Sequence, residues 1–298
     1  MVLAVVLVLL GIIVALVLQA QVLARSCLKL EKSKLTRIQL RETAGDGIWR
    51  ALNQLAADPL LLVDHTNEAW AARAFYKLPG GIEVETAIFD ENRFLDANML
   101  AYVSPAGEWR PPAAIIRDLL AGDEQVANPE TQTEIIRDWV DQDTEGNYEK
   151  SYYQRKEMEF HPDNLPMESR DELLWLLDTT TNTAFHGTAL TILPGKERRI
   201  EPVNVNTADR QTLLAVFGLN NAALVERIIR ARASTPITAL DQVLDPIALK
   251  KYASYLSVRS SFFSVHARAI MGSSMEEVYC LAKRDAAGNV QVIRWAEY

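Results

Sequence analysis

Cysteine and histidine, the residues that build most disulfide-bonded domains and zinc sites, are scarce in this 298-residue chain. The two cysteines, Cys27 and Cys280, lie far apart in the sequence, cannot form a disulfide framework and are expected to be unpaired thiols. The four histidines are scattered without the spacing of metal ligands; they are His65, His161, His186 and His266. The chain is therefore expected to be neither a zinc enzyme nor a small disulfide-bonded domain.

The sequence also lacks the short motifs that mark many enzymes. It contains no nucleophile elbow, no phosphate-binding loop and no cysteine–histidine pairing. Acidic residues are plentiful, with 39 Asp and Glu against 31 Lys and Arg, but sequence alone does not identify a catalytic pair among them. The formal net charge of -8 repels phosphate backbones unless basic residues are gathered on one face. We therefore expect no small-molecule substrate and no nucleic-acid partner.

Charged and polar side chains are absent from the first 18 residues. Such a run is just long enough to cross a bilayer as a helix, and it lacks the basic start and the small-residue cleavage site of a signal peptide. Helical spacing of apolar residues continues to Asp58-Pro59, weakened locally by Gly45 and Gly47. We predict one helix over residues 1–57, about 85 Å long. Its first third fits a membrane, and the remainder is amphipathic.

Alternating apolar and polar residues predict strands at both ends of the remaining chain. One strand is expected at 82–89, and an antiparallel meander is expected from 263 to 295. The spacing between them predicts helices at 113–121, 130–140, 168–177, 207–232 (a pair), 239–244 and 246–255, with an irregular polar stretch at 141–166. We therefore predict an α+β fold, with the N-terminal helix packed on a small antiparallel sheet and a large helical domain inserted into it. The predicted domains are 1–57 for the helix, 58–100 with 257–298 for the sheet, and 101–256 for the insertion.

The clearest sign of a ligand is an acidic loop at residues 138–149. Oxygen donors stand at alternate positions in Asp141, Asp143 and Glu145, directly before Gly146. This is the pattern of the front half of a calcium loop, to which Glu149 and the backbone carbonyl of Asn147 can add ligands. The loop is not an EF-hand, because the twelfth position is Tyr152 and not glutamate. Two interpretations remain: a calcium site formed by Asp141, Asp143, Glu145 and Glu149, or a solvated acidic loop.

Residues 203–232 have the pattern of two helices joined by a tight turn. Thr207 is expected to cap the first helix, Gly218 to end it, and a second helix to run from about 222 to 232. Helix-hairpin-helix modules that bind DNA have this pattern, with a turn whose glycines let the backbone approach a phosphate. The second glycine is missing here, since Gly218 is followed by Leu219-Asn220-Asn221. We expect helix packing and not DNA contact.

Taken in order, these features resemble the K subunit of type II secretion systems, a minor pseudopilin. Pseudopilins normally carry glutamate at the fifth mature position, and the K subunit is known for lacking it; the residue here is Val5. The usual basic leader does not precede the apolar run, as expected of a mature chain or of a misassigned start. The segments that carry the resemblance are the apolar helix, Asp138-Trp139-x-Asp141, Asn164-x-Pro166, Asp171-Glu172-Leu173, Val203–Ala208 and the terminal meander.

The resemblance implies a pseudopilin fold and a place at the tip of the periplasmic pseudopilus, with I- and J-type minor pseudopilins as partners. It implies a single-pass protein of the bacterial inner membrane whose C-terminal domain lies in the periplasm. The orientation rests on the resemblance alone, because basic residues after the apolar run, such as Arg25 and Lys29, usually stay cytoplasmic. It also implies calcium in the acidic loop, although the family's Gly-Gly-Ala-Glu run is replaced by Glu-Gly-Asn-Tyr-Glu, which leaves the individual ligands open. The alternatives are a membrane-anchored helix-hairpin-helix DNA-binding protein of the competence type and a membrane-tethered periplasmic hydrolase.

Overall fold

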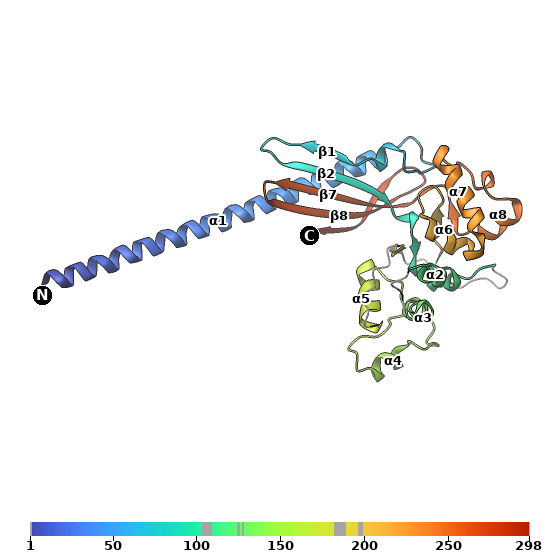
Figure 1. Ribbon diagram of the computed structural model, residues 1–298, viewed down its shortest axis with the longest axis horizontal. Helices are drawn as coiled ribbons and strands as arrows, with labels where there is room; N and C mark the ends of the chain where they lie inside the picture. The colour runs from blue at the N-terminus through green and yellow to red at the C-terminus, as the bar shows by residue number, and fades with distance from the viewer. Residues whose placement is uncertain are drawn as a thin grey trace.

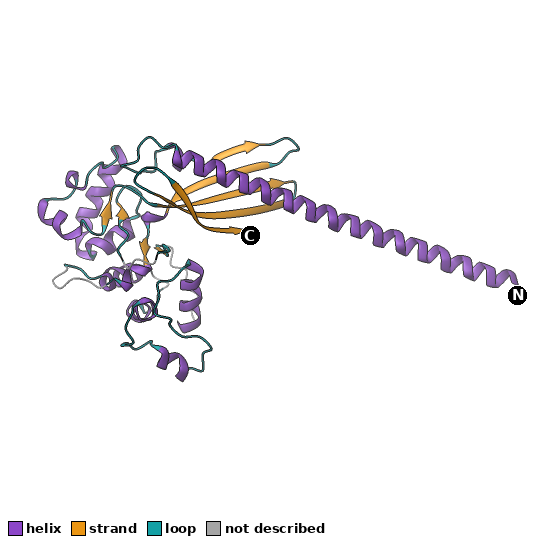
Figure 2. Ribbon diagram, turned by 180° about the vertical axis from the view of Figure 1, so that it is seen from behind, coloured by secondary structure: helices purple, strands orange, loops and turns teal. Residues whose placement is uncertain are grey.

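A single helix, α1 (Val2–Ala56), forms the N-terminal fifth of the protein. In the computed structural model, which describes residues 2–102, 109–123, 126, 128–181, 189–195 and 199–297, it packs along one face of a sheet and projects far beyond it (Figures 1 and 2). The helix contains no proline, and it ends just before Asp58-Pro59, because a proline disfavours helical conformation in the residue that precedes it. The long helix predicted from the sequence is confirmed.

The sheet has five antiparallel strands in the order β1-β2-β7-β8-β9. β2 and β7, which lie on either side of the inserted helices in the sequence, are direct neighbours, with Glu83 opposite Ile270 and Asp90 opposite Phe263. The predicted antiparallel sheet interrupted by a helical insertion is therefore confirmed. The strands are β1 (Ala74–Lys77), β2 (Glu83–Asp90), β7 (Phe262–Met271), β8 (Ser274–Arg284) and β9 (Val290–Glu297).

The C-terminal half of α1 buries one side against this sheet. Leu40, Ala44, Ile48 and Leu55 are completely buried and recur at helical spacing. The two glycines that weaken the helical pattern are positions of close approach: a Cβ on Gly47 would lie 3.1–3.2 Å from atoms of Thr86, Ala267 and Tyr76, and Gly45 faces the ring of Trp295. Small residues here let the helix lie close to the strands.

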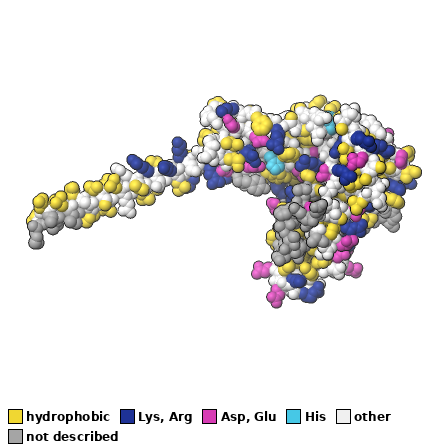
Figure 3. Space-filling model, in the orientation of Figure 1, with side chains coloured by type: hydrophobic (Ala, Val, Ile, Leu, Met, Phe, Trp, Pro, Cys, Tyr) yellow, Lys and Arg dark blue, Asp and Glu magenta, His cyan; other side chains and the backbone are white. Residues whose placement is uncertain are grey.

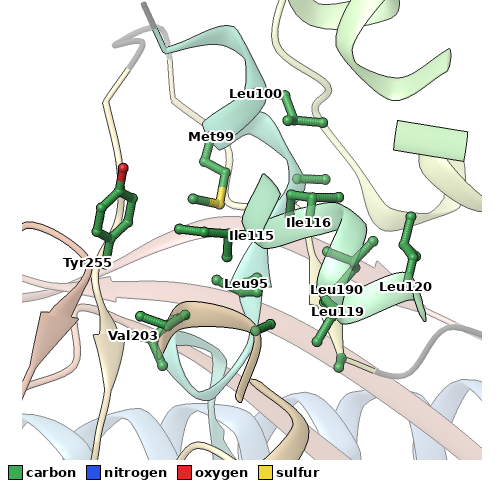
Figure 4. Packing of buried hydrophobic residues seen from close by; sticks show 14 of the residues in the cluster. Leu95, Met99, Leu100, Ile115, Ile116, Leu119, Leu120, Leu190, Val203 and Tyr255 are labelled. Atoms are coloured by element: carbon green, nitrogen blue, oxygen red, sulfur yellow. The ribbon is translucent and has the colours of Figure 1, made fainter. Parts of the chain in front are cut away.

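The insertion has a hydrophobic cluster of its own, which begins at Leu95 and ends at Leu256 (Figure 4). Two short parallel strand pairs, β3 with β4 and β5 with β6, connect distant segments of the insertion by hydrogen bonds. Its helices are α2 (Pro112–Ala121), α3 (Pro129–Val140), α4 (Lys150–Arg155), α5 (Arg170–Thr181), α6 (Arg210–Phe217), α7 (Ala222–Ser234) and α8 (Pro246–Tyr252). Its strands are β3 (Leu95–Asp96), β4 (Leu190–Thr191), β5 (Val203–Asn204) and β6 (Leu256–Ser257).

Some local predictions were wrong. Asp209, and not Thr207, caps α6, because its carboxylate accepts a hydrogen bond from the backbone N–H of Thr212 at 2.6 Å. The hydroxyl of Thr207 instead donates to Asp90, at the end of β2. The irregular stretch at 141–166 contains α4, and the helix predicted at 239–244 is only a 3₁₀ turn at Leu240–Gln242. Strand β1 was not predicted, because its four residues are too few to show a clear alternation.

Candidate metal centre and membrane helix

The acidic loop joins α3 to α4, and three of its four predicted ligands lie together. One carboxylate oxygen from each of Asp141, Asp143 and Glu149 lies within 4.8 Å of the other two. The side chain of Glu145 is outside this group, although its backbone N–H donates to Oδ1 of Asp143 at 2.9 Å. The geometry therefore brings together a cluster of three carboxylates and leaves Glu145 on the exposed side of the loop.

Glu149 is the residue of this cluster that most needs a positive partner. It is 6% exposed, and its Oε1 has no hydrogen-bond partner among the described residues. Burial, followed by the charges of Asp138, Asp141 and Asp143, raises the pKa of Glu149 to about 7. A buried carboxylate oxygen beside two other carboxylates is a fitting ligand for a hard cation, and the donor set of oxygens alone fits calcium.

The loop is held from beneath by Asp138, which is fully buried at the end of α3. Its carboxylate accepts hydrogen bonds from the side chain of Arg137 and from the backbone N–H of Tyr148, both at 2.9 Å. A Cβ on Gly146 would come closer than 3.0 Å to both oxygens of Asp138. Gly146 is therefore needed for this close contact, which the sequence pattern did not indicate. The side-chain amide of Asn164 donates to the carbonyl of Asp143 and closes the loop from the other side.

Aromatic rings pack under the loop. Trp139 is at the centre, with ring centroids of Tyr153, Phe160 and Trp175 at 5.9, 6.3 and 6.2 Å. Its indole N–H donates to Oε1 of Glu172 on α5 at 3.0 Å. These contacts join α3, α4 and α5, so the position of the carboxylates is determined by a rigid aromatic cluster and not by the loop alone.

The helical hairpin of α6 and α7 uses its basic residues internally. The side chain of Arg227 donates to the carbonyl of Val243, and that of Arg232 to the carbonyl of Val205, each at 2.6 Å. Arg210 forms an ion pair with Glu226 at 2.6 Å. These arginines stabilise the hairpin through contacts within the protein, so they are poorly placed to bind a phosphate backbone.

The N-terminal part of α1 has the length and composition of a membrane span. Among the single helices in the described part of the chain, it is the one that meets this criterion. Exposed apolar side chains lie along it, and on the face seen in Figure 3 lysines and arginines follow them closer to the sheet. The bent pair of α6 and α7 passes the same test when taken together, but several of its side chains belong to the hydrophobic cluster of the insertion. The protein thus has one N-terminal helix suited to a single-pass anchor.

The part of α1 between this span and the sheet has a second apolar side, which we call the outer stripe. It consists of Leu28, Leu35, Ile38 and Trp49, each more than half exposed. The ring of Trp49 lies 6.1 Å from that of Trp295 on β9, so the stripe continues onto the edge of the sheet. The sequence predicted the buried side of this helix but not the outer stripe, because both sides contain similar apolar residues.

Comparison with known proteins supports one fold. The sequence matches no family model, and no curated protein is similar enough in sequence to count as a relative. The structure is similar to a chain in the crystal structure of the GspK-GspI-GspJ complex from the enterotoxigenic Escherichia coli type 2 secretion system, with a TM-score of 0.61. The match covers 92% of this chain and 99% of that chain, at 18% sequence identity.

Together with the long helix and the interrupted sheet, this likeness defines a pseudopilin-type fold. More particularly, the chain has the GspK-like form of that fold, with a large helical insertion.

Proposed function

We propose that this protein is the K-type minor pseudopilin of a type II protein secretion system. The observation that carries the proposal is the structural likeness to the GspK-GspI-GspJ complex, which extends over 92% of the chain and includes the inserted helices. The protein acts as a structural component of the secretion machinery and not as an enzyme. Its head lies in the periplasm, and α1 anchors it in the inner membrane by a single span.

In this proposal its partners are the I- and J-type minor pseudopilins, and the outer stripe of α1 contacts them. Exposed large apolar side chains in a row are unfavourable in water and are typical of surfaces that become buried on association. Trp49 and Trp295 form an aromatic pair of the kind that often dominates the energy of an interface. The buried side of α1 already faces the sheet, so a partner helix is left with the outer stripe.

Two features support a place at the tip of the pseudopilus. The apolar run has no carboxylate, and a carboxylate buried in a membrane without a partner is costly. Within a filament, such a carboxylate would pair with the terminal amine of the next subunit. A terminal subunit has no such neighbour, so the absence of the carboxylate removes the cost of burying it unpaired. The insertion is also bulky, which obstructs repetition of this subunit in a regular helical array (Figure 1).

We propose further that the acidic loop binds calcium through Asp141, Asp143 and Glu149, with Glu145 adding little. The three carboxylates would hold the ion between α3 and α4, and it would neutralise the buried charge of Glu149. A ligand that binds only the folded state raises its stability by mass action. The site would therefore stabilise the insertion in a calcium-containing compartment.

The partner proposal is tested by co-purification of the full chain with I- and J-type pseudopilins from the same cell. We expect a complex of the three proteins, and Trp49→Asp should weaken it more than Phe75→Asp, which changes an exposed aromatic residue on the opposite edge strand. No association with either partner would contradict the proposal.

The calcium proposal is tested by thermal unfolding with and without calcium at about 1 mM, the range of weak extracellular sites. Asp141→Asn with Asp143→Asn should reduce the calcium-dependent increase in Tm, and so should Glu149→Gln. Glu145→Gln is the matched control and should retain the increase. If the Tm of the wild type did not respond to calcium, the calcium proposal would be wrong and the solvated acidic loop would be the remaining interpretation.

The DNA-binding alternative is not favoured, because Arg227 and Arg232 are held by backbone carbonyls and the hairpin turn has a single glycine.

A further inference from the structure

A second group of three carboxylates lies where α1 ends and the chain turns back toward the sheet. Asp58 lies two residues after the end of the helix, and Asp64 and Glu68 lie in the segment that leads to β1. One carboxylate oxygen from each lies within 4.8 Å of the other two. This cluster belongs to the pseudopilin sheet, whereas the acidic loop belongs to the insertion.

One arginine shares this cluster. Arg284, at the end of β8, is completely buried; it forms an ion pair with Asp58 at 2.8 Å and a second ion pair with Asp64. The backbone N–H of Ser260 donates to Oδ2 of Asp64 at 2.8 Å. With all three acids ionised, one guanidinium faces three carboxylates, and the buried group carries two uncompensated negative charges.

Glu68 has one carboxylate oxygen that no described group compensates. It is 8% exposed; its Oε1 accepts a hydrogen bond from the backbone N–H of His65 at 2.6 Å, and its Oε2 has no hydrogen-bond partner in the described part of the chain. Burial, with further contributions from the neighbouring Asp58 and Asp64, raises the pKa of Glu68 to about 7. Two other titratable groups lie near the cluster. His65 has Nε2 at 3.9 Å from Oε1 of Glu68, and Asp90 accepts a hydrogen bond from the hydroxyl of Ser260, the residue whose backbone N–H donates to Asp64.

Ionised carboxylates that lie close together in a buried site repel each other, and a proton or a cation between them removes this repulsion. A proton would leave the cluster with one uncompensated negative charge. A divalent cation would bring the charge of the three carboxylates and Arg284 to zero, which removes the main cost of burying them. Since the available donors are oxygens alone, a hard cation is the chemically suitable occupant.

We infer that Asp58, Asp64 and Glu68 form a binding site for a divalent cation of the calcium type, with water or carbonyl oxygens completing its coordination. Oε2 of Glu68, which has no hydrogen-bond partner among the described residues, would coordinate the cation. The site joins the end of α1 to Arg284 at the end of β8 and to Ser260 before β7. A bound ion therefore fixes how the membrane helix is attached to the head, independently of any ion in the acidic loop.

The test is calorimetric titration of the full chain in detergent with calcium chloride, after treatment with a chelator. Glu68→Gln keeps the shape of the side chain and removes its charge, and it should bind one calcium ion fewer per chain than the wild type. Glu83→Gln is the matched control, because Glu83 is an exposed glutamate that forms an ion pair with Lys77 on the neighbouring strand, and it should leave the number unchanged. The same loss should occur when Asp141→Asn and Asp143→Asn are already present, which separates this site from the acidic loop.

Equal calcium binding by the wild type and Glu68→Gln would overturn the inference and leave a shared proton as the occupant. A second measurement leaves Asp58, Asp64 and Glu68 unchanged, so it does not depend on whether Glu68→Gln folds. The protein carrying Asp141→Asn and Asp143→Asn should still show a calcium-dependent increase in Tm. No calcium binding by this protein at about 1 mM would also overturn the inference.

Discussion

Two isoleucines on α1 separate the stability of the head from its association with partners. Ile48 is completely buried between α1 and the sheet, whereas Ile38, ten residues earlier on the outer stripe, is 55% exposed. Ile48→Ala removes buried methyl groups from a well-packed cluster, so we expect the free energy of unfolding to fall by about 2–5 kcal/mol. Ile38→Ala changes a solvated position, and the same free energy should stay within about 0.5 kcal/mol of the wild type.

Partner binding should be more sensitive to Ile38→Ala than to Ile48→Ala, the reverse of the effect on stability. Ile38→Ala should weaken co-purification with I- and J-type pseudopilins, while Ile48→Ala should weaken it only to the extent that the head unfolds. Urea unfolding followed by tryptophan fluorescence measures the free energy of unfolding, because Trp70 packs against Phe263 in the same cluster as Ile48. An unchanged free energy of unfolding for Ile48→Ala, or an Ile38→Ala variant as unstable as Ile48→Ala, would refute this division of roles between the two sides of α1.

Three further outcomes are expected. Gly146→Ala should lower stability by about 1–3 kcal/mol by forcing Asp138 aside, while Gly195→Ala, where a Cβ meets open space, should not; equal unfolding midpoints would contradict the contact. Burial raises the pKa of Asp90 from 3.8 to about 6, so the folded state holds this proton more tightly than the unfolded chain. Its contribution, roughly 3 kcal/mol, is lost as pH rises from about 4 through 6; unfolding at several pH values should show a flatter profile for Asp90→Asn, and parallel profiles would refute this. Electrophoretic shift assays at physiological salt should detect no tight binding of duplex DNA; submicromolar binding that disappears with Arg227→Ala and Arg230→Ala would favour the DNA-binding alternative.

Periodicity predicted the large elements of this fold well. The apolar run and the i, i+4 spacing of Ala44, Ile48 and Leu52 identify α1, because a long helix repeats its pattern many times. The alternation at 82–89 and after 263 identifies β2, β7, β8 and β9, since each strand has one face on the hydrophobic cluster. Where the pattern is long, chance matches are few, and the element boundaries were correct to within a few residues.

Short and long-range features were harder to predict. Thr207 and Asp209 are both good helix caps, and tertiary contact with Asp90 decides between them. Glu145 follows the calcium-loop spacing, yet its exposed side chain lies outside the group formed by Asp141, Asp143 and Glu149. Asp58, Asp64 and Glu68 have no motif spacing, and the pairing of Asp58 and Asp64 with Arg284 depends on a contact between distant parts of the chain. Such clusters can be recognised only after folding has placed the residues side by side.

The most direct test of the proposed function is the composition of isolated pseudopili. Quantitative mass spectrometry should find this protein in small amount relative to the major subunit, together with I- and J-type minor pseudopilins, and labelling should place it at one end of each filament. A protein repeated along the shaft at a level comparable to the major subunit, or absent from the filaments altogether, would contradict the account.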